Sequence, residues 1–167
     1  MNTTYDVEPI DRAEEAGRCV DMMLTSEPWI TLGLARETGL TILNDRGKEV
    51  YAVRDGHGVA GFIVLEMRGF ATGYVQILCV RSDCRGRGVG SALLQWAEDR
   101  IFRDSPNAFI CVSSFNPDAR RLYERRGFEL VGVLRDFIVT GYDEALLRKT
   151  RGTWAEFRRK QQLTADT

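Results

Sequence analysis

The sequence of 167 residues lacks several features that define whole classes of protein. No run of about eighteen apolar residues occurs, and the N-terminus lacks the basic and then apolar pattern of a signal peptide, so we expect neither a membrane span nor export. The single histidine and the four cysteines show no CxxC or similar metal-ligand spacing, which argues against a zinc site and against a disulfide framework. We therefore predict a cytoplasmic protein without a metal centre.

An excess of charge of one sign is also missing. Lys and Arg number 23 and Asp and Glu number 24, a formal net charge of -1, which does not favour nucleic acid or an acidic membrane as a partner. The charges are nevertheless unevenly placed. Acidic residues are concentrated in residues 1–30, and arginines in residues 81–103, 120–126 and 148–159. We expect one acidic and one basic region on the folded protein.

The length and the hydrophobic content of 44% suit one compact α/β domain over residues 1–167. A short strand is expected at residues 5–10. Asp11 is a suitable N-cap for the helix that follows, and apolar residues keep helical spacing as far as Leu24. A second short helix is expected at residues 29–37, after a turn.

The middle of the chain carries the signals of antiparallel strands. Residues 49–54 and 59–67 form two apolar runs joined by Asp55-Gly56-His57-Gly58, a strong hairpin signal. A third antiparallel strand is expected at residues 72–80, after a turn at Gly69. This part of the chain therefore predicts three consecutive strands of one sheet.

The second half alternates between helix and strand. Apolar residues recur with helical spacing from Val89 to Ile101 and predict a long amphipathic helix. Asn116 is suited to the N-cap of a later helix, which Gly127 terminates. The remaining elements, a strand, that helix, two antiparallel strands and a possible terminal helix, are expected at residues 108–113, 117–126, 128–134, 144–150 and 151–162.

The most informative segment is Arg85-Gly86-Arg87-Gly88-Val89-Gly90, which lies between a predicted strand and the long helix. Glycines let a backbone approach a ligand closely, and the unpaired N–H groups at a helix start favour an anion. No Lys-Ser/Thr pair completes a P-loop, and no GxGxxG precedes an acidic ribose ligand. The segment predicts a pyrophosphate site, although a flexible arginine-flanked turn explains it about as well by itself.

A second segment, from Asn116 to Phe128, makes the first one specific. It has the pattern N, x, x, A, x, x, x, Y, x, x, x, G, F. In this order and spacing, the two segments resemble the GNAT superfamily of acetyltransferases. The tail at residues 135–147 also resembles the corresponding segment of the ribosomal-protein alanine N-acetyltransferases in that superfamily. The resemblance extends to about Thr150. It implies a mixed, mostly antiparallel sheet of six or seven strands flanked by about four helices and splayed between strands four and five.

The resemblance also implies how acetyl-CoA is held, as a co-substrate. Backbone N–H groups near Cys79 and Val80 would bind the thioester carbonyl and the pantetheine arm, and Asn116 would contact the pantetheine. Asn116 could instead be only an N-cap. The pyrophosphate would be bound by the amides of Arg85, Gly86, Arg87, Gly88, Val89, Gly90 and Ser91.

The catalytic residue that the resemblance implies is Tyr123, which would protonate the departing thiolate. Its helical spacing places it on the same face as Ala119 and Leu122, so its ring points inward. A core tyrosine with a satisfied hydroxyl is the alternative. The implied reaction is direct attack of a primary amine on the thioester.

No general base is evident. The alanine acetyltransferases place a glutamate where this sequence has Cys111, and a solvated turn explains His57. Glu66 ends an apolar strand and could face the cleft through water, although a solvent-facing strand end explains it about as well. At pH 7, neutralising a lysine-like amine costs about 4.6 kcal/mol and an α-amine only about 1 kcal/mol. A protein or peptide N-terminus is therefore slightly favoured over a small-molecule amine or amino acid, which stays the alternative.

The residues around the acceptor are implied by the resemblance as well. The first two helices and their loop would wall the acceptor site, with Glu27 and Trp29 among the residues of this wall. Phe137 and Tyr142 would line its mouth, although exposed aromatics can also belong to an interface.

Three points stay open in the sequence. A protein that keeps the glycine segment without effective acid and base groups would be a non-catalytic acyl-CoA binding module. The terminal helix could close a homodimer. A solvated helix surface explains most of the arginines that could meet the 3′-phosphate of coenzyme A, which are Arg81, Arg120, Arg121 and Arg125.

Overall fold

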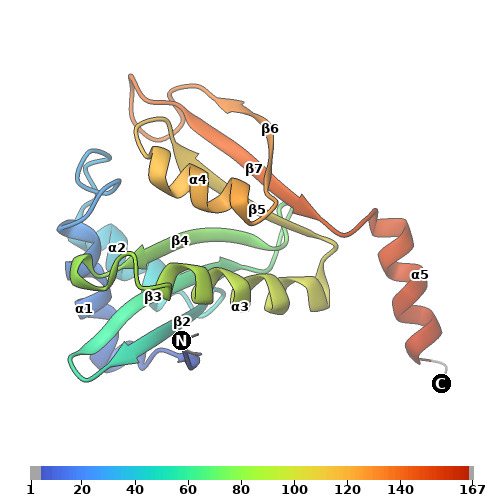
Figure 1. Cartoon of the computed structure of the whole chain (residues 1–167), viewed down its shortest axis with the longest axis horizontal. Coiled ribbons are helices and arrows are strands. Elements are labelled where there is room, and N and C mark those ends of the chain that lie inside the picture. The colour runs from blue at the N-terminus through green and yellow to red at the C-terminus, as the bar shows by residue number, and fades with distance from the viewer. Residues whose placement is uncertain (1–4, 166–167) are drawn as a thin grey trace.

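The computed structural model describes residues 5–165, which form a seven-stranded sheet and five helices (Figure 1). The strands are β1 (Val7–Pro9), β2 (Glu49–Asp55), β3 (Gly58–Glu66), β4 (Tyr74–Val80), β5 (Asn107–Ser113), β6 (Glu129–Leu134) and β7 (Glu144–Thr150). The helices are α1 (Arg12–Leu24), α2 (Arg36–Asn44), α3 (Val89–Asp104), α4 (Pro117–Arg125) and α5 (Trp154–Ala165), with a 3-10 turn at η1 (Ser82–Cys84). In this part of the chain, no helix is long and apolar enough to cross a membrane.

The strand order is β1-β2-β3-β4-β5-β7-β6, and only the β4–β5 pair is parallel. This confirms the predicted mixed, mostly antiparallel sheet. Side chains alternate between its two faces. One face packs on α3 and α4 and is called the α3 face, and the other packs on α1 and α2 and is called the α1 face.

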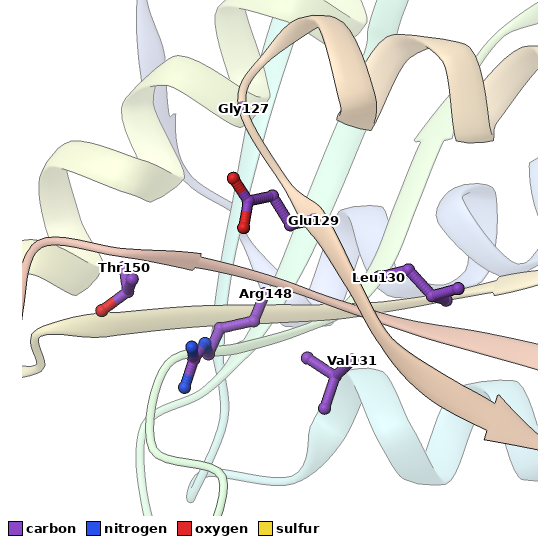
Figure 2. A pocket seen from close by; sticks show the side chains of 6 residues that line it. All are labelled: Gly127, Glu129, Leu130, Val131, Arg148 and Thr150. Carbon is purple, nitrogen blue, oxygen red and sulfur yellow. The ribbon is translucent and has the colours of Figure 1, made fainter.

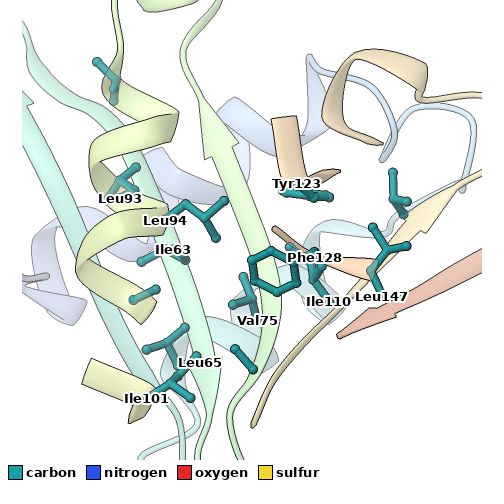
Figure 3. Close-up of a cluster of buried hydrophobic side chains, with 14 of the residues drawn as sticks. Ile63, Leu65, Val75, Leu93, Leu94, Ile101, Ile110, Tyr123, Phe128 and Leu147 are labelled. Carbon is teal, nitrogen blue, oxygen red and sulfur yellow. The ribbon is translucent and has the colours of Figure 1, made fainter. Parts of the chain in front are cut away.

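Apolar side chains fill both faces of the sheet. On β3, Ile63 and Leu65 belong to the α3-face cluster, while Phe62 and Val64 belong to the α1-face cluster, and all four are fully buried. Figure 3 shows part of the α3-face cluster, including Leu93 and two other apolar side chains from α3. Burial of each such side chain contributes about 1.5–3 kcal/mol relative to exposure, so this strand holds the two halves of the core together.

Local capping signals act as the sequence predicts. The Asp11 side chain accepts hydrogen bonds from the N–H groups of Ala13 at 3.0 Å and Glu14 at 3.3 Å. Gly127 follows the C-cap of α4 in the left-handed region, with φ of 85°. In the β2–β3 hairpin, the His57 N–H donates to Asp55 Oδ1 at 2.8 Å.

The prediction of a helix at residues 29–37 is wrong. Hydrogen-bonded turns occupy this segment up to Gly33, whose φ of 65° interrupts a right-handed helix. The second helix is α2 instead. It begins after Ala35, which has no side-chain cap, so the sequence holds no local signal for its start.

The sheet opens between β4 and β5. Only Tyr74 with Phe109 and Val75 with Ile110 pair across these two strands. The register of β3 with β4 shifts next to this point and leaves Gln76 of β4 without a partner in the ladder, as in a β-bulge. Beyond the bulge β4 and β5 diverge, which confirms the predicted splay (Figure 1). We call the gap between the diverging strands the fork.

A buried ion-pair cluster fixes α4 beside the fork. The carboxylate of Glu98 on α3 is 3% exposed and pairs with Arg126, which caps α4, at 3.1 Å, and also with Lys149 of β7. A buried carboxylate needs such partners, because removing one leaves an uncompensated charge. The cluster thus joins α3, α4 and β7.

The predicted terminal helix is present as α5, which stands apart from the sheet in Figure 1. It contacts the end of α3, where the Gln161 side chain donates to the Arg103 carbonyl at 2.9 Å. Just before α5, the Arg151 guanidinium lies 4.1 Å from the ring centroid of Phe102. The helix α5 therefore lies beside the C-terminal end of α3.

Candidate functional site

Backbone groups of β4 line one side of the fork. The Arg81 N–H donates to the Ala60 carbonyl at 2.9 Å, toward β3. In an antiparallel pair successive residues alternate in direction, so Cys79 is also directed toward β3, while Leu78 and Val80 are directed toward the fork. Beyond Val75 no β5 residue pairs with β4 in the ladder, so these groups of Leu78 and Val80 can meet a ligand.

The glycine segment lies directly after β4 and η1. Gly86 and Gly88 have φ of 73° and 89°, and Gly88 is the N-cap of α3 without a side-chain cap. Among the described residues none accepts a hydrogen bond from the amides of residues 86–91, whereas the Arg85 N–H is 3.4 Å from the Ser82 carbonyl. The segment thus presents unpaired donors at the positive end of a helix of 16 residues.

Close packing keeps this segment against the fork. A Cβ atom at Gly90 would lie 3.4 Å from Cγ2 of Val80 and 3.8 Å from Cδ2 of Leu122, in ordinary van der Waals contact, so α3 starts beside both β4 and α4. The Tyr5 hydroxyl donates to the Arg87 carbonyl at 2.8 Å. This long-range contact supports the loop from the outside, and no sequence pattern indicates it.

Tyr123 is placed as its helical spacing predicts. Its side chain is 6% exposed and belongs to the α3-face cluster with Phe128, whose ring centroid lies 6.2 Å away (Figure 3). No described residue forms a hydrogen bond with its hydroxyl, and burial raises the pKa of this hydroxyl. Tyr123 is therefore protonated at neutral pH and keeps a donor that the protein does not use.

Asn116 acts as the N-cap of α4, since its side-chain oxygen accepts from the Ala119 N–H at 3.3 Å. Its amide nitrogen has no partner among the described residues. The capping role therefore uses one end of the side chain and leaves the other end available.

Several polar side chains lie together on the α1 face of the fork. The sequence did not predict that they are neighbours. Ile110 and Val112 belong to the α3-face cluster, so the alternate residues Cys111 and Ser113 of β5 lie on the α1 face. Ser113 pairs with Glu144 of β7, and its hydroxyl donates to the Glu144 carboxylate. Burial raises the pKa of Glu144, and the hydrogen bond from Ser113 opposes this shift.

Tyr74 completes this group from β4. Burial, and next the neighbouring Cys111, raise the pKa of the Tyr74 hydroxyl, and the charges of Glu144 and Tyr123 act in the same direction. Burial also raises the pKa of Cys111. Both groups are thus uncharged at neutral pH. We call Tyr74, Cys111, Ser113 and Glu144 the α1-face cluster of the fork.

Gln76 adds an unsatisfied acceptor. Its side-chain oxygen is buried and has no hydrogen-bond partner among the described residues. An unpaired buried polar atom costs about 1–3 kcal/mol, and this one lies on the bulge where β4 leaves β5. A donor group of a bound ligand would remove that cost.

The other candidate acids and bases lie outside the fork. Glu66 pairs with Lys48 at 3.1 Å at the β3 end where the sheet is closed. His57 is exposed in the β2–β3 turn. Neither side chain belongs to the group that faces the fork.

Most of the arginines that could meet a phosphate are already paired. Arg81 pairs with Asp55 at 2.5 Å and with Asp83 at 2.6 Å and so ties the loop to the β2–β3 hairpin. Arg120 pairs with Glu124 at 2.8 Å, and Arg121 with Asp118. Arg85, Arg87 and Arg125 are exposed, and none of their guanidinium groups pairs with a carboxylate of the described residues. The Arg85 guanidinium donates to the Val80 carbonyl at 3.3 Å.

The predicted acceptor residues lie on two loops. Glu27 is exposed and accepts from the Thr31 N–H and hydroxyl at 3.2 and 3.0 Å, and Trp29 packs on the cluster under α1. Phe137 is 60% exposed, and Tyr142 is 40% exposed with its ring against Phe115. Both loops lie toward the end of the molecule where β4 and β5 diverge (Figure 1).

A hollow of about 230 Å³ lies away from the fork, on the edge formed by β6 and β7 (Figure 2). Its lining includes Glu129 and Arg148, which face each other across the two strands, and Thr150 at the C-terminal end of β7. Glu144 lies at the opposite end of β7. The hollow is therefore separate from the site described above.

A sheet that forks between parallel β4 and β5, with a glycine-rich helix start beside the fork, is the fold that the sequence resemblance implies. The family model for the acetyltransferase (GNAT) family matches residues 15–128. This chain therefore belongs to the GNAT acetyltransferase family.

Individual relatives agree with this assignment. An acetyltransferase from Agrobacterium fabrum is 36% identical over 100 residues, which cover 59% of this chain and 64% of that protein. An uncharacterized N-acetyltransferase from Methanocaldococcus jannaschii is 33% identical over 95 residues, which cover 56% of this chain and 60% of that protein. The matches to these two relatives thus span about three fifths of the relatives' own lengths.

Solved structures share the fold. A ribosomal-protein-alanine N-acetyltransferase from Brucella melitensis has a TM-score of 0.70 at 18% identity, covering 87% of this chain and 99% of its own. An aminoglycoside 6′-N-acetyltransferase complexed with coenzyme A also has a TM-score of 0.70, at 17% identity, covering 87% of this chain and 96% of its own.

Proposed function

We propose that this protein is an acetyl-CoA dependent N-acetyltransferase in which a primary amine attacks the thioester directly. The observation that carries the proposal is the row of unpaired amides at residues 86–91, placed beside a fork that exposes further backbone donors of β4. These donors fit a pyrophosphate and a thioester carbonyl. The unused hydroxyl of Tyr123 lies in the cluster next to the same fork.

The acyl donor would be held mainly by backbone groups. The amides of residues 86–91 would bind the pyrophosphate, and the N–H groups of Leu78 and Val80, rather than that of Cys79, would meet the pantetheine arm and the thioester oxygen. The free amide nitrogen of Asn116 would contact the pantetheine. Arg125 is the most available of the four arginines for a phosphate, because it alone has no carboxylate partner among the described residues.

Tyr123 would donate its proton toward the departing sulfur. Burial raises the pKa of its hydroxyl above the ordinary value of about 10, and a thiol has a pKa of about 8.5, so complete transfer is uphill in the free protein. The hydroxyl is therefore a hydrogen-bond donor first, and the proton moves as charge develops on the sulfur.

A peptide or protein N-terminus is the preferred acceptor. An α-amine is easier to neutralise than a lysine-like amine, as the pKa values of about 7.7 and 10.4 show. The fold similarity to a ribosomal-protein-alanine acetyltransferase fits this preference. The similarity to an aminoglycoside acetyltransferase keeps a small-molecule amine as the second candidate.

Two measurements test the proposal. Isothermal titration should show binding of one acetyl-CoA per chain, and absence of binding would refute it. Thiol release should then be followed with a panel of acceptors: tripeptides that begin with Ala, Ser or Met, spermidine and kanamycin. Turnover of spermidine or kanamycin alone would reverse the preference for a peptide, and binding without any turnover would indicate a non-catalytic acyl-CoA module.

A further inference from the structure

Glu144 is the buried carboxylate of the α1-face cluster. Glu144 is 3% exposed and is the first residue of β7. It pairs in register with Ser113, the last residue of β5. Ser113 is 5% exposed and donates its hydroxyl proton to Glu144. A carboxylate that is removed from water and bonded to a single hydroxyl is a base whose proton would travel through that hydroxyl.

The Ser113–Glu144 pair and Tyr123 lie on opposite faces of the sheet. Tyr123 belongs to the cluster on the α3 face, and Glu144 and Ser113 alternate with Ala145 and Val112, which belong to that same cluster. The pair therefore lies on the opposite face of the sheet. The two faces meet only where the sheet is open, which is the fork between β4 and β5.

The strand register joins the pair to the fork. Ser113 lies on β5 beyond Ile110, the last residue of β5 that pairs with β4, so the pair borders the open part of the sheet. Burial is the largest cause of the raised pKa values of Tyr74 and Cys111, and Glu144 adds a smaller effect in the same direction. On its other side, its partner in register on β6 is the apolar Leu134.

We propose that Glu144 takes the proton of the acceptor ammonium through the hydroxyl of Ser113, so that the amine meets the thioester in its neutral form. This inference rests on the proposed function. It places the acceptance of the amine proton on the α1 face of the fork and the protonation of the sulfur, by Tyr123, on the α3 face.

The protons and electrons balance in this scheme. One ammonium proton passes to Ser113 Oγ as the Ser113 hydroxyl proton passes to Glu144. The nitrogen lone pair then forms the N–C bond, the C–S bond breaks, and its electron pair leaves on the sulfur. Tyr123 gives its proton to the sulfur and regains one from the nitrogen, and the third proton stays on the amide. Glu144 finally releases its proton to solvent.

The charge state of Glu144 gives the scheme a pH signature. Burial raises the pKa of Glu144, so the carboxylate form, which is the one that accepts a proton, is lost as the pH falls through this raised value. Tyr74 and Cys111, the titratable groups that face it, have raised pKa values and remain neutral in that range. Between the pKa of Glu144 and that of the amine, kcat/KM should not depend on pH.

The decisive experiment compares pH profiles of kcat/KM for the wild type and Glu144→Gln, with the panel amine that the wild type acetylates best. The variant cannot take the proton, so its substrate must arrive already neutral. Its kcat/KM should rise about tenfold per pH unit up to the amine pKa, about 7.7 for an α-amine. At pH 6.5 the variant should be slower by about 100-fold, within the range for general-base catalysis.

Two further variants separate proton transfer from structure. Ser113→Ala should give the sloped profile of Glu144→Gln, whereas Ser113→Thr keeps a hydroxyl and should restore the flat profile. Glu15→Gln is a matched control, since Glu15 is a buried glutamate on α1 that pairs with Arg54 at 2.7 Å outside the fork. It should leave the profile flat. Acetyl-CoA titration of Glu144→Gln should give an affinity within about threefold of the wild type.

The outcomes distinguish this inference from the proposed function. If the wild type turns over an amine but Glu144→Gln gives a profile of unchanged shape, only the inference is overturned. The same conclusion holds if Ser113→Ala and Ser113→Thr behave alike. If acetyl-CoA binds and no panel amine is acetylated by the wild type, the proposed reaction and this inference are refuted together.

Discussion

The two faces of the fork are built in different ways. On the α3 face, the groups that we propose bind the ligand are unpaired backbone amides from one continuous segment, 86–91, and the nearby Tyr123 comes from one short helix. On the α1 face, the polar groups are side chains from three strands, with Tyr74 on β4, Ser113 on β5 and Glu144 on β7. A backbone site can be recognised from a motif, but a site of side chains from separate strands depends on how these strands pair.

The comparison is tested most strongly at Tyr123, the side chain on the α3 face that we propose as the general acid. Tyr123→Phe removes the hydroxyl and keeps the ring that packs near Phe128. We expect kcat to fall by about 100-fold, in the range for a general acid. The affinity for acetyl-CoA should change by less than about threefold, because the proposed binding groups are backbone amides.

Steady-state kinetics of thiol release, together with isothermal titration, check this prediction. A loss of acetyl-CoA binding in the variant would show that Tyr123 supports the binding site instead. An unchanged kcat would remove Tyr123 from the reaction.

The backbone character of the α3 face is tested at Gly88. Its φ of 89° is unfavourable for any L residue, and the left-handed conformation costs such a residue about 1–2 kcal/mol. Gly88→Val should therefore distort the amides that we propose bind the phosphates and weaken acetyl-CoA binding by about tenfold, since 1.4 kcal/mol corresponds to that factor.

Isothermal titration of acetyl-CoA measures this effect, with Gly132→Ala as a control. Gly132 lies on β6, away from the fork, and nothing lies within 4 Å of a Cβ atom added there. The control should bind acetyl-CoA as the wild type does. Equal affinities in Gly88→Val and the control would mean that side chains, not amides, hold the phosphates.

The smallest expected effect concerns the support of the loop from outside. Tyr5→Phe removes the hydrogen bond to the Arg87 carbonyl while keeping the ring. A neutral hydrogen bond contributes about 0.5–1.5 kcal/mol, and this one is exposed, so acetyl-CoA binding should weaken by about threefold. Titration at the same pH and salt as the wild type would detect this change, and an affinity equal to that of the wild type would show that the loop holds its shape unaided.

The sequence predicted the elements whose signals are local. Asp11 and Gly127 mark helix ends, and Asp55-Gly56-His57-Gly58 marks a hairpin, because each acts through its own neighbours. The prediction of a helix at residues 29–37 was wrong because no local signal marks where the second helix begins. Gly33 adopts a left-handed conformation there, and α2 starts at a position without a cap.

The candidate site was predictable on one face only. The glycine segment and Tyr123 belong to continuous motifs, so their positions follow from the sequence. Ser113 and Glu144 are 31 residues apart and meet through β5–β7 pairing, while Tyr5 and Arg87 are 82 residues apart. The resemblance indicated that the glutamate base is missing at Cys111. Strand pairing places the carboxylate of Glu144 opposite Ser113, two residues further along β5.

The most direct test of the account is a crystal structure of this protein with acetyl-CoA bound. We predict pyrophosphate oxygens within about 3 Å of the amides of residues 86–91. The thioester should lie in the fork, with its oxygen near the Val80 N–H and its sulfur near the Tyr123 hydroxyl. Acetyl-CoA bound at another surface, or with its thioester outside the gap between β4 and β5, would contradict the account.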